Sequence, residues 1–274
     1  MPPRLDPADP PAAARASTAL VSTRGNRRTL EFQPGDIQSE MLLSAPHALV
    51  LEYARAMMCF ALFVPHPRHI LMVGLGGGSM VKFCHRHFPD TRITVVEISS
   101  EVIALREQFR VPPDDARLRI VHADAADYLA CADALPDAVV DVILVDGFDA
   151  TGMPESLGSE RFYADCRRAL RAGGVLVANF LSYDPARTQL AARLAAAFGG
   201  RVCDFAGIAG NNHLLFAVRT GAGVDASSLP ALRMQRRVMR RRGLGFGLLN
   251  RLLARAVVAW LAWRPARAAR RMQT

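Results

Sequence analysis

A glycine-rich turn directly after a short apolar segment constrains this chain most strongly. Residues 69–73 are apolar and have the length of a buried strand, and Gly74-Leu75-Gly76-Gly77-Gly78-Ser79 follows them without a gap. Glycine lets the main chain approach a ligand closely because it has no Cβ, and the start of a helix favours negative charge. Since a helical pattern follows the turn, the segment predicts a nucleoside-binding strand–turn–helix unit. The predicted cofactor-binding glycines are Gly74, Gly76, Gly77 and Gly78.

Strand and helix patterns alternate along the rest of the chain. Expected strands cover residues 69–73, 92–98, 118–121, 139–145 and 175–180, and expected helices cover 100–109, 125–131, 159–170 and 185–198. This alternation predicts a mostly parallel sheet with helices on both faces. A strand pair at 202–205 and 213–218 predicts an antiparallel edge. We therefore predict an α/β fold of the Rossmann-like, class I methyltransferase type, with a short N-terminal β-hairpin and a basic C-terminal helix.

Composition divides the chain into four parts. Residues 1–28 are rich in Pro, Ala and Arg and are expected to form a disordered leader, without the apolar core of a secretory signal. Residues 29–64 are expected to form a hairpin around Pro34-Gly35 and a helix over 47–63. Residues 65–220 are the expected catalytic domain, and 221–274 a linker and basic amphipathic tail. The five cysteines are scattered, which is typical of reduced thiols in a cytoplasmic protein and predicts no metal site.

The net charge of +9 comes from the C-terminal segment. Residues 231–274 contain twelve Arg and no acidic residue, whereas the remainder has 22 basic and 25 acidic residues. A slightly acidic body argues against nucleic acid as a partner. In the tail, Arg251 and Arg255 share one helical face and a mainly apolar face lies opposite, with Leu249, Leu252, Leu253, Ala256, Val257, Trp260 and Leu261. Such a helix suits an anionic membrane surface, a partner protein, or packing on its own domain.

Acidic residues stand at the ends of the second and third expected strands. Glu97 lies 19 residues after Gly78, where an acidic side chain commonly accepts hydrogen bonds from ribose hydroxyls. Asp124 follows the next strand and can accept a hydrogen bond from an adenine amino group. The alternatives are a solvated carboxylate at Glu97 and a helix cap at Asp124.

The fourth expected strand ends in two carboxylates, Asp146 and Asp149. Open α/β sheets bind ligands in the crevice outside the carboxyl ends of their strands. Two carboxylates at this edge can hold a cationic amine and accept its proton as the amine becomes a nucleophile. The alternative is a turn, or ion pairs with nearby arginines.

Together these residues resemble the spermidine/spermine synthase (polyamine aminopropyltransferase) family over about residues 29–219. The resemblance is carried by Gln38, the glycine turn, Glu97, Asp124, the run from Asp146 to Leu157, and Phe162-Tyr163. It implies that an aminopropyl group passes from decarboxylated S-adenosylmethionine to a small-molecule amine acceptor, in a cytoplasmic homodimer. It also implies that Glu97 contacts ribose, Asp124 contacts adenine, and Gln38 approaches the ligand from the hairpin. Asp146 would be the general base, and Asp149 would help to bind the amine.

The chain departs from this family at the substrate side. Gly77 stands where the family has an Asp that holds the donor's primary amine, and Tyr53-Ala54-Arg55 replaces a Tyr-His-Glu segment that lines the diamine site. A guanidinium at Arg55 would repel a diamine, and loss of the Asp favours intact S-adenosylmethionine as an alternative donor. The alternatives are therefore a methyltransferase, or another transferase, that uses intact S-adenosylmethionine, and a catalytically inactive nucleoside-binding module.

Overall fold

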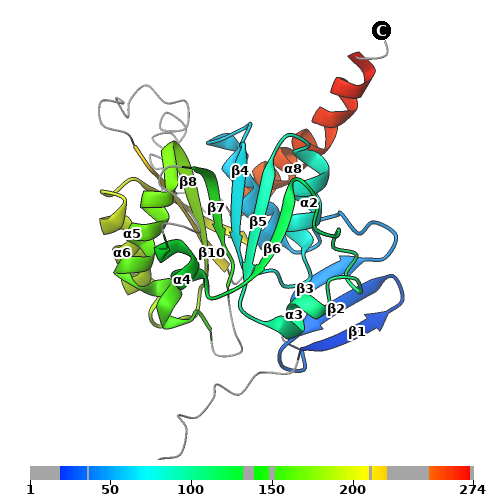
Figure 1. Cartoon of the computed structure of the whole chain (residues 1–274), viewed down its shortest axis with the longest axis horizontal. Coiled ribbons are helices and arrows are strands. Elements are labelled where there is room, and N and C mark those ends of the chain that lie inside the picture. The colour runs from blue at the N-terminus through cyan, green and yellow to red at the C-terminus, as the bar shows by residue number, and fades with distance from the viewer. Residues whose placement is uncertain are drawn as a thin grey trace, which may run out of the picture.

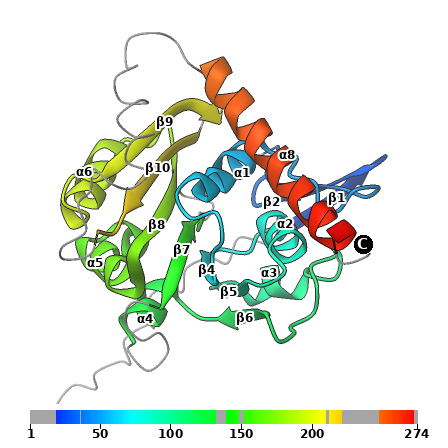
Figure 2. The same ribbon diagram turned by 90° about the horizontal axis from the view of Figure 1, so that it is seen from above.

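A seven-stranded sheet forms the centre of the computed structural model, which describes residues 19–35, 37–131, 139–147, 152–209, 212–220 and 247–271. The strands lie in the order β6-β5-β4-β7-β8-β10-β9 (Figures 1 and 2), and β10 runs antiparallel to both of its neighbours. Their bounds are β4 His69–Val73, β5 Arg92–Glu97, β6 Leu118–His122, β7 Val140–Val145, β8 Leu170–Leu181, β9 Val202–Ala209 and β10 Asn212–Val218. The predicted parallel sheet and its antiparallel edge are confirmed.

Helices cover both faces of this sheet, as Figure 2 shows. On one face are α4 Ala125–Ala130, α5 Glu160–Ala169 and α6 Arg187–Ala197, with a short 3₁₀ turn at Glu155–Gly158. On the other are α1 Glu52–Met57, the 3₁₀ turn Met58–Leu62, α2 Ser79–His87, α3 Ser100–Ala104 and α8 Gly247–Arg271. Because both faces are covered, β4 is buried along its whole length, as the apolar residues 70–73 indicate. Each face contributes its own cluster of buried apolar side chains.

A separate antiparallel sheet precedes the main one. It contains β1 Leu20–Arg24, β2 Arg27–Glu31 and β3 Ile37–Leu42. The predicted hairpin corresponds to β2 and β3, but β1 lies inside the segment predicted to be a disordered leader. β1 extends the hairpin through the turn at Gly25, whose φ of 55° suits glycine. The part of the predicted leader before residue 19 lies outside the described residues.

The C-terminal helix α8 folds back on the domain and contacts α1, α2, β9 and the 3₁₀ turn before β4. Its Ala254, Val257 and Leu261 are buried in the same apolar cluster as α1. Leu252 and Trp260 were predicted to share this apolar face, but they are 51% and 39% exposed. The prediction was wrong for these two residues because the stripe of side chains that packs on the domain is narrower than the apolar stripe in the sequence. No helix among the described residues is long and apolar enough to cross a membrane.

Two ion pairs fix α8 to α1. Arg251 Nε lies 3.2 Å from Glu52 Oε2, and Arg255 contacts Glu52 Oε1 at 3.3 Å. The two arginines share one face of α8, as predicted, and both use it to bind the acidic residue at the start of α1. Of the three predicted roles for the tail, the structure shows one: the helix packs on its own domain.

Candidate active site

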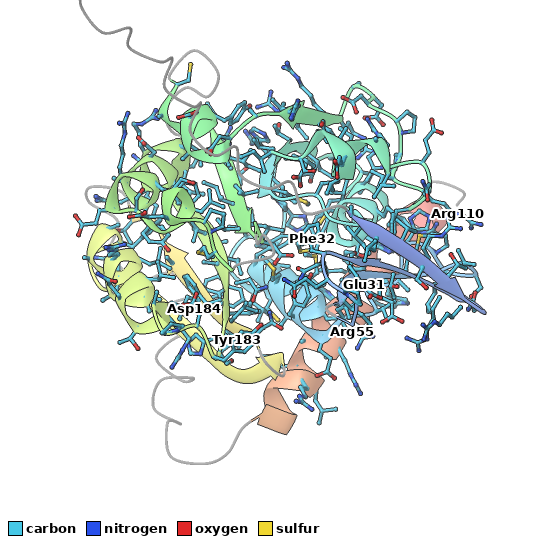
Figure 3. All side chains as sticks on the ribbon, turned by 90° about the horizontal axis from the view of Figure 1, so that it is seen from below. Glu31, Phe32, Arg55, Arg110, Tyr183 and Asp184 are labelled. Carbon is cyan, nitrogen blue, oxygen red and sulfur yellow. The ribbon has the colours of Figure 1, made fainter. Side chains whose placement is uncertain are left out.

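A cavity of about 240 Å³ lies at the carboxyl ends of the central parallel strands. Its lining runs from the end of β6 to the end of β7 and includes the point between β4 and β7 where the strand order reverses, which is the usual ligand position in open α/β sheets. The N-terminal sheet and α1 supply part of its wall. In Figure 3 the labels of Phe32, which follows β2, and of Arg55, in α1, mark these two elements. The lining includes Gln38, Ser39, Tyr53, Gly74, Leu75, Gly76, Ser79, Glu97, Asp124 and Asp146.

The glycine turn after β4 is shaped by its close contacts. A Cβ on Gly74 would lie 2.4 Å from the backbone oxygen of Asp146, and one on Gly78 would lie 2.3 Å from Val111 Cγ2. Both residues also have positive φ angles, of 93° and 62°. Gly74 and Gly76 line the cavity, whereas Gly77 and Gly78 are not among its lining residues. The first part of the turn therefore faces the cavity, and the second part packs against Ser39, Phe109 and Val111.

Glu97 is held rigidly at the end of β5. Its side chain is only slightly exposed; Oε2 accepts a hydrogen bond from the Leu75 amide at 2.7 Å, and Oε1 accepts one from the Ser99 amide at 2.8 Å. The alternative of a freely solvated carboxylate is therefore wrong. The first of these bonds also ties Glu97 to the glycine turn, so the two predicted ligand-binding features form one wall of the cavity.

Asp124 caps α4 and lines the cavity. Its Oδ1 accepts hydrogen bonds from the amides of Ala126, at 2.6 Å, and Asp127, at 3.4 Å. Capping and ligand binding were predicted as competing roles. Because the cap uses one carboxylate oxygen, the same side chain can present the other to the cavity.

Asp146 follows β7 and its carboxylate receives two hydrogen bonds inside the cavity wall. Asn179 Nδ2 donates to Oδ1 at 2.8 Å, and the Tyr53 hydroxyl donates as well. Burial raises the pKa of Asp146 above its ordinary value, while the two hydrogen bonds oppose the rise because they stabilise the charged form. The result is a carboxylate in one fixed orientation and with increased basicity. Asp149, its predicted companion, lies outside the described residues.

The Asp146 network contains residues that the sequence analysis did not assign to the site. Asn179 is 1% exposed near the carboxyl end of β8, and its Oδ1 accepts a hydrogen bond from Asn212 Nδ2 at 3.0 Å. The Tyr53 hydroxyl also lies 3.3 Å from the main-chain oxygen of Gln38. A lone amide within the apolar β8 sequence was the available signal, because a buried polar side chain needs a partner.

Arg55 does not occupy the position that its sequence suggests. Tyr53 and Ala54 line the cavity, but Arg55 does not; its Nε donates to the main-chain oxygen of Leu49 at 2.6 Å. Burial, together with the charge of Arg255, lowers the pKa of Arg55. The predicted repulsion of a diamine by this guanidinium is therefore not supported by the geometry. The family's acidic residue is lost here without a cation taking its place in the cavity.

Comparisons with known proteins agree with this architecture. A sequence profile of the spermine/spermidine synthase domain matches residues 51–183. A polyamine aminopropyltransferase of Chromobacterium violaceum is 38% identical over 245 residues, which cover 88% of this chain and 92% of that protein.

Two solved structures share the fold. A probable spermidine synthase of Corynebacterium glutamicum superposes with a TM-score of 0.63 at 22% identity, over 82% of this chain and 87% of the other. Human methyltransferase-like protein 13, in complex with SAH, superposes with a TM-score of 0.56 at 26% identity, over 69% of this chain and 93% of the other. By its sequence and its fold, this chain belongs to the spermidine/spermine synthase family of transferases.

Proposed function

We propose that this protein transfers an aminopropyl group from decarboxylated S-adenosylmethionine to an amine acceptor, with Asp146 as the general base. The observation that carries the proposal is the Asp146 carboxylate, held by Tyr53 and Asn179 in the cavity that Glu97 also lines. We assign residues 65–220 as the catalytic domain, which supplies most of this cavity, and residues 221–274 as a linker and basic tail, whose described helix α8 contributes no lining residue.

The strand order supports a direction for the donor. Asp124, Glu97, the glycine turn and Asp146 follow β6, β5, β4 and β7, which are neighbours in that order. In our proposal Asp124 Oδ2 accepts from the adenine amino group, Glu97 binds the ribose hydroxyls, and the glycines Gly74, Gly76, Gly77 and Gly78 form the turn beside the sulfonium. Gln38 closes the cavity from β3, and Asp149 helps to bind the acceptor.

The chemistry follows from the state of Asp146. Its carboxylate takes a proton from the acceptor ammonium group, and the freed nitrogen lone pair attacks the methylene carbon bonded to the sulfonium. A carbon–nitrogen bond forms while the carbon–sulfur bond breaks, and the bonding electrons return to sulfur, which leaves as methylthioadenosine. The raised pKa suits this role because a more basic carboxylate drives the proton transfer further.

Release of methylthioadenosine tests the proposal directly. The purified chain is incubated with the decarboxylated donor and a panel of diamines of different chain length, and methylthioadenosine is measured by chromatography. We expect release that depends on an amine, and loss of most of it, about a hundredfold or more, in the Asp146→Asn variant. Amine-dependent release at the wild-type rate from that variant would remove Asp146 from the mechanism.

Gly77 favours a second candidate function, an S-adenosylmethionine-dependent methyltransferase. Without the acidic residue of the family at this position, the carboxylate of the intact donor is not repelled. Adenosylhomocysteine released from intact donor, with no methylthioadenosine from the decarboxylated one, would select this candidate. Tight nucleoside binding without either product would leave the third possibility, a catalytically inactive nucleoside-binding module.

We further propose that the protein is a cytoplasmic homodimer; light scattering after size-exclusion chromatography tests the oligomeric state.

We also propose that the tail associates peripherally with an anionic membrane. Leu252, Trp260 and Trp263 are 51%, 39% and 49% exposed and lie outside the packed stripe of α8, within a segment rich in Arg. The protein should sediment with anionic but not with neutral vesicles, and Trp260→Ser with Trp263→Ser should abolish this. Binding to neither kind of vesicle would favour a partner protein on α8 instead.

A further inference from the structure

The cavity wall beside the glycine turn carries hydroxyl groups where the resemblance leads us to expect an acid. Ser39 of β3 and Ser79 at the start of α2 both line the cavity, and their Oγ atoms lie 3.4 Å apart. A Cβ added to Gly77 would lie 2.6 Å from Ser39 Oγ and 2.8 Å from Phe109 Cδ1. The space of an acidic side chain at position 77 is thus already filled. We call Ser39, Gly77 and Ser79 the tail subsite.

Behind this subsite lies the only lysine of the chain. Lys82 is fully buried, and its Nζ donates to the main-chain oxygens of Gly77, at 3.0 Å, and Phe109, at 2.7 Å. Its third contact is Met41 Sδ at 3.2 Å, so none of its described contacts is a carboxylate. Burial, together with the charge of Arg110, lowers the pKa of Lys82 to about 7, which leaves part of the population cationic at neutral pH.

Two acidic residues beside the subsite, Glu40 and Glu97, are already engaged. The Glu40 carboxylate, next to Ser39 in β3, pairs with Arg27. Both oxygens of Glu97 accept main-chain hydrogen bonds. Among the described residues, the tail subsite therefore offers hydroxyls to a ligand, with a buried amine behind them, and no acidic side chain of its own for a ligand ammonium group.

The order of the strands brings the part of the donor beyond its sulfur to the tail subsite. If adenine lies over the end of β6 and ribose over β5, the sulfonium lies over β4, because neighbouring strands are about 4.8 Å apart. The chain that continues from the sulfur then passes the turn, where Gly76, Ser79 and Ser39 line the cavity. Hydroxyls at the start of α2, with a buried cation behind them, can accommodate a carboxylate as well as an ammonium group.

We propose that the tail subsite accepts a carboxylate, so that the protein binds intact S-adenosylmethionine and adenosylhomocysteine as tightly as the decarboxylated donor and methylthioadenosine. Ser39 is the residue that determines this tolerance, because it fills the place of the missing acid. The inference rests on the nucleoside site of the proposed function, but it concerns only the group carried beyond the sulfur.

Calorimetry with four ligands tests it: intact donor, decarboxylated donor, adenosylhomocysteine and methylthioadenosine. We expect adenosylhomocysteine to bind within about threefold of methylthioadenosine, and the two donors within about threefold of each other, since the tail subsite itself has no acidic side chain that would repel the carboxylate. A preference of about tenfold or more for the decarboxylated donor would overturn the proposal. Methylthioadenosine has no tail, so failure of all four ligands to bind would overturn the nucleoside site itself, and with it both proposals.

A matched pair of variants separates charge from size. Ser39→Asp places a carboxylate in the subsite and should weaken adenosylhomocysteine about tenfold or more relative to methylthioadenosine, while Ser39→Asn, of the same size, should leave the ratio within about threefold. Equal ratios in the two variants would show that charge at position 39 does not act on the tail. If neither variant folds, as judged by circular dichroism, the wild-type ratios still decide the question.

Discussion

Replacing Asn179 by Ala tests how the fold sets the basicity of Asp146. Asn179 Nδ2 donates to Asp146 Oδ1 at 2.8 Å from a fully buried position in β8. Alanine leaves a small space at that position and removes the donor, while the Tyr53 hydroxyl remains. Because this hydrogen bond stabilises the ionised carboxylate more than the neutral acid, its loss should raise the pKa of Asp146 further.

The size of the shift follows from the strength of the bond. A hydrogen bond to a charged group contributes about 1.5–3 kcal/mol, and one pKa unit corresponds to about 1.4 kcal/mol, so we expect a rise of roughly one to two units. A general base acts in its deprotonated form. The acidic limb of the kcat/KM profile should therefore move to higher pH by the same amount, with little change of kcat/KM on the plateau above it.

The assay is methylthioadenosine release from pH 5 to 9 at subsaturating amine. Asn212→Ala is the matched control, because Asn212 donates to Asn179 Oδ1 at 3.0 Å and reaches Asp146 only through it. We expect this control to shift the limb by less than about half a unit, since it removes a neutral hydrogen bond one step away. An unchanged acidic limb in Asn179→Ala, with activity intact, would refute the assignment of Asp146 as the titrating base.

Three further predictions concern the fold around the site. The pKa of Lys82, about 7 in the folded chain against 10.5 when unfolded, means that the unfolded state binds more protons above pH 7; from pH 7 to 9 the unfolding free energy should rise by about 2 kcal/mol in urea titrations, and Lys82→Met should remove this rise. Gly74→Ala would place its Cβ 2.4 Å from a backbone oxygen and should abolish calorimetric nucleoside binding, whereas Gly25→Ala, at a positive φ but with nothing within 4 Å, should leave the affinity unchanged. Leu261→Ala should cost about 2–4 kcal/mol because the side chain is fully buried in α8, and Leu252→Ala, 51% exposed, less than about 0.5; equal losses would mean that α8 does not pack as described.

The sequence predicts most of the sheet and the ligand-facing ends of its strands. Strand and helix patterns repeat at fixed periods, and acidic residues directly after strands must meet at one edge of a parallel sheet, so Glu97, Asp124 and Asp146 could be assigned to one cavity. Asn179 could not be assigned, because its contact joins residues 33 apart in sequence and no local pattern records a pairing between β7 and β8.

The substrate side shows the same limit more clearly. Arg55 matches a substrate-site position of the family in sequence, yet its side chain binds a main-chain oxygen away from the cavity. Gly77 records the loss of an acid, but only the fold shows that Ser39 and Phe109 fill the space. Side-chain direction depends on tertiary packing, which sequence periodicity does not contain, and α8 illustrates this where Trp260 lies outside the packed stripe.

The Asp146 network allows stability and chemistry to be separated. Burial raises the pKa of this carboxyl above its unfolded value of 3.8, so the stability that it contributes in the protonated state is fully present below that value and is lost as pH rises through the folded pKa. At neutral pH the ionised group therefore destabilises the fold. Asp146→Asn keeps an acceptor for Asn179 and cannot ionise, so it should raise the Tm at pH 7 while it abolishes turnover.

A nucleoside-binding module without catalysis would gain stability from the Asp146→Asn substitution and would lose no activity. An enzyme, in contrast, needs the buried acid as its base. Differential scanning calorimetry at pH 7 and pH 4 measures the effect, and the gain in Tm should shrink at the lower pH, where the wild-type carboxyl is more fully protonated. A lower Tm for the variant at pH 7 would contradict the argument, because it would mean that the ionised carboxylate stabilises the fold through its hydrogen bonds and is retained for structure.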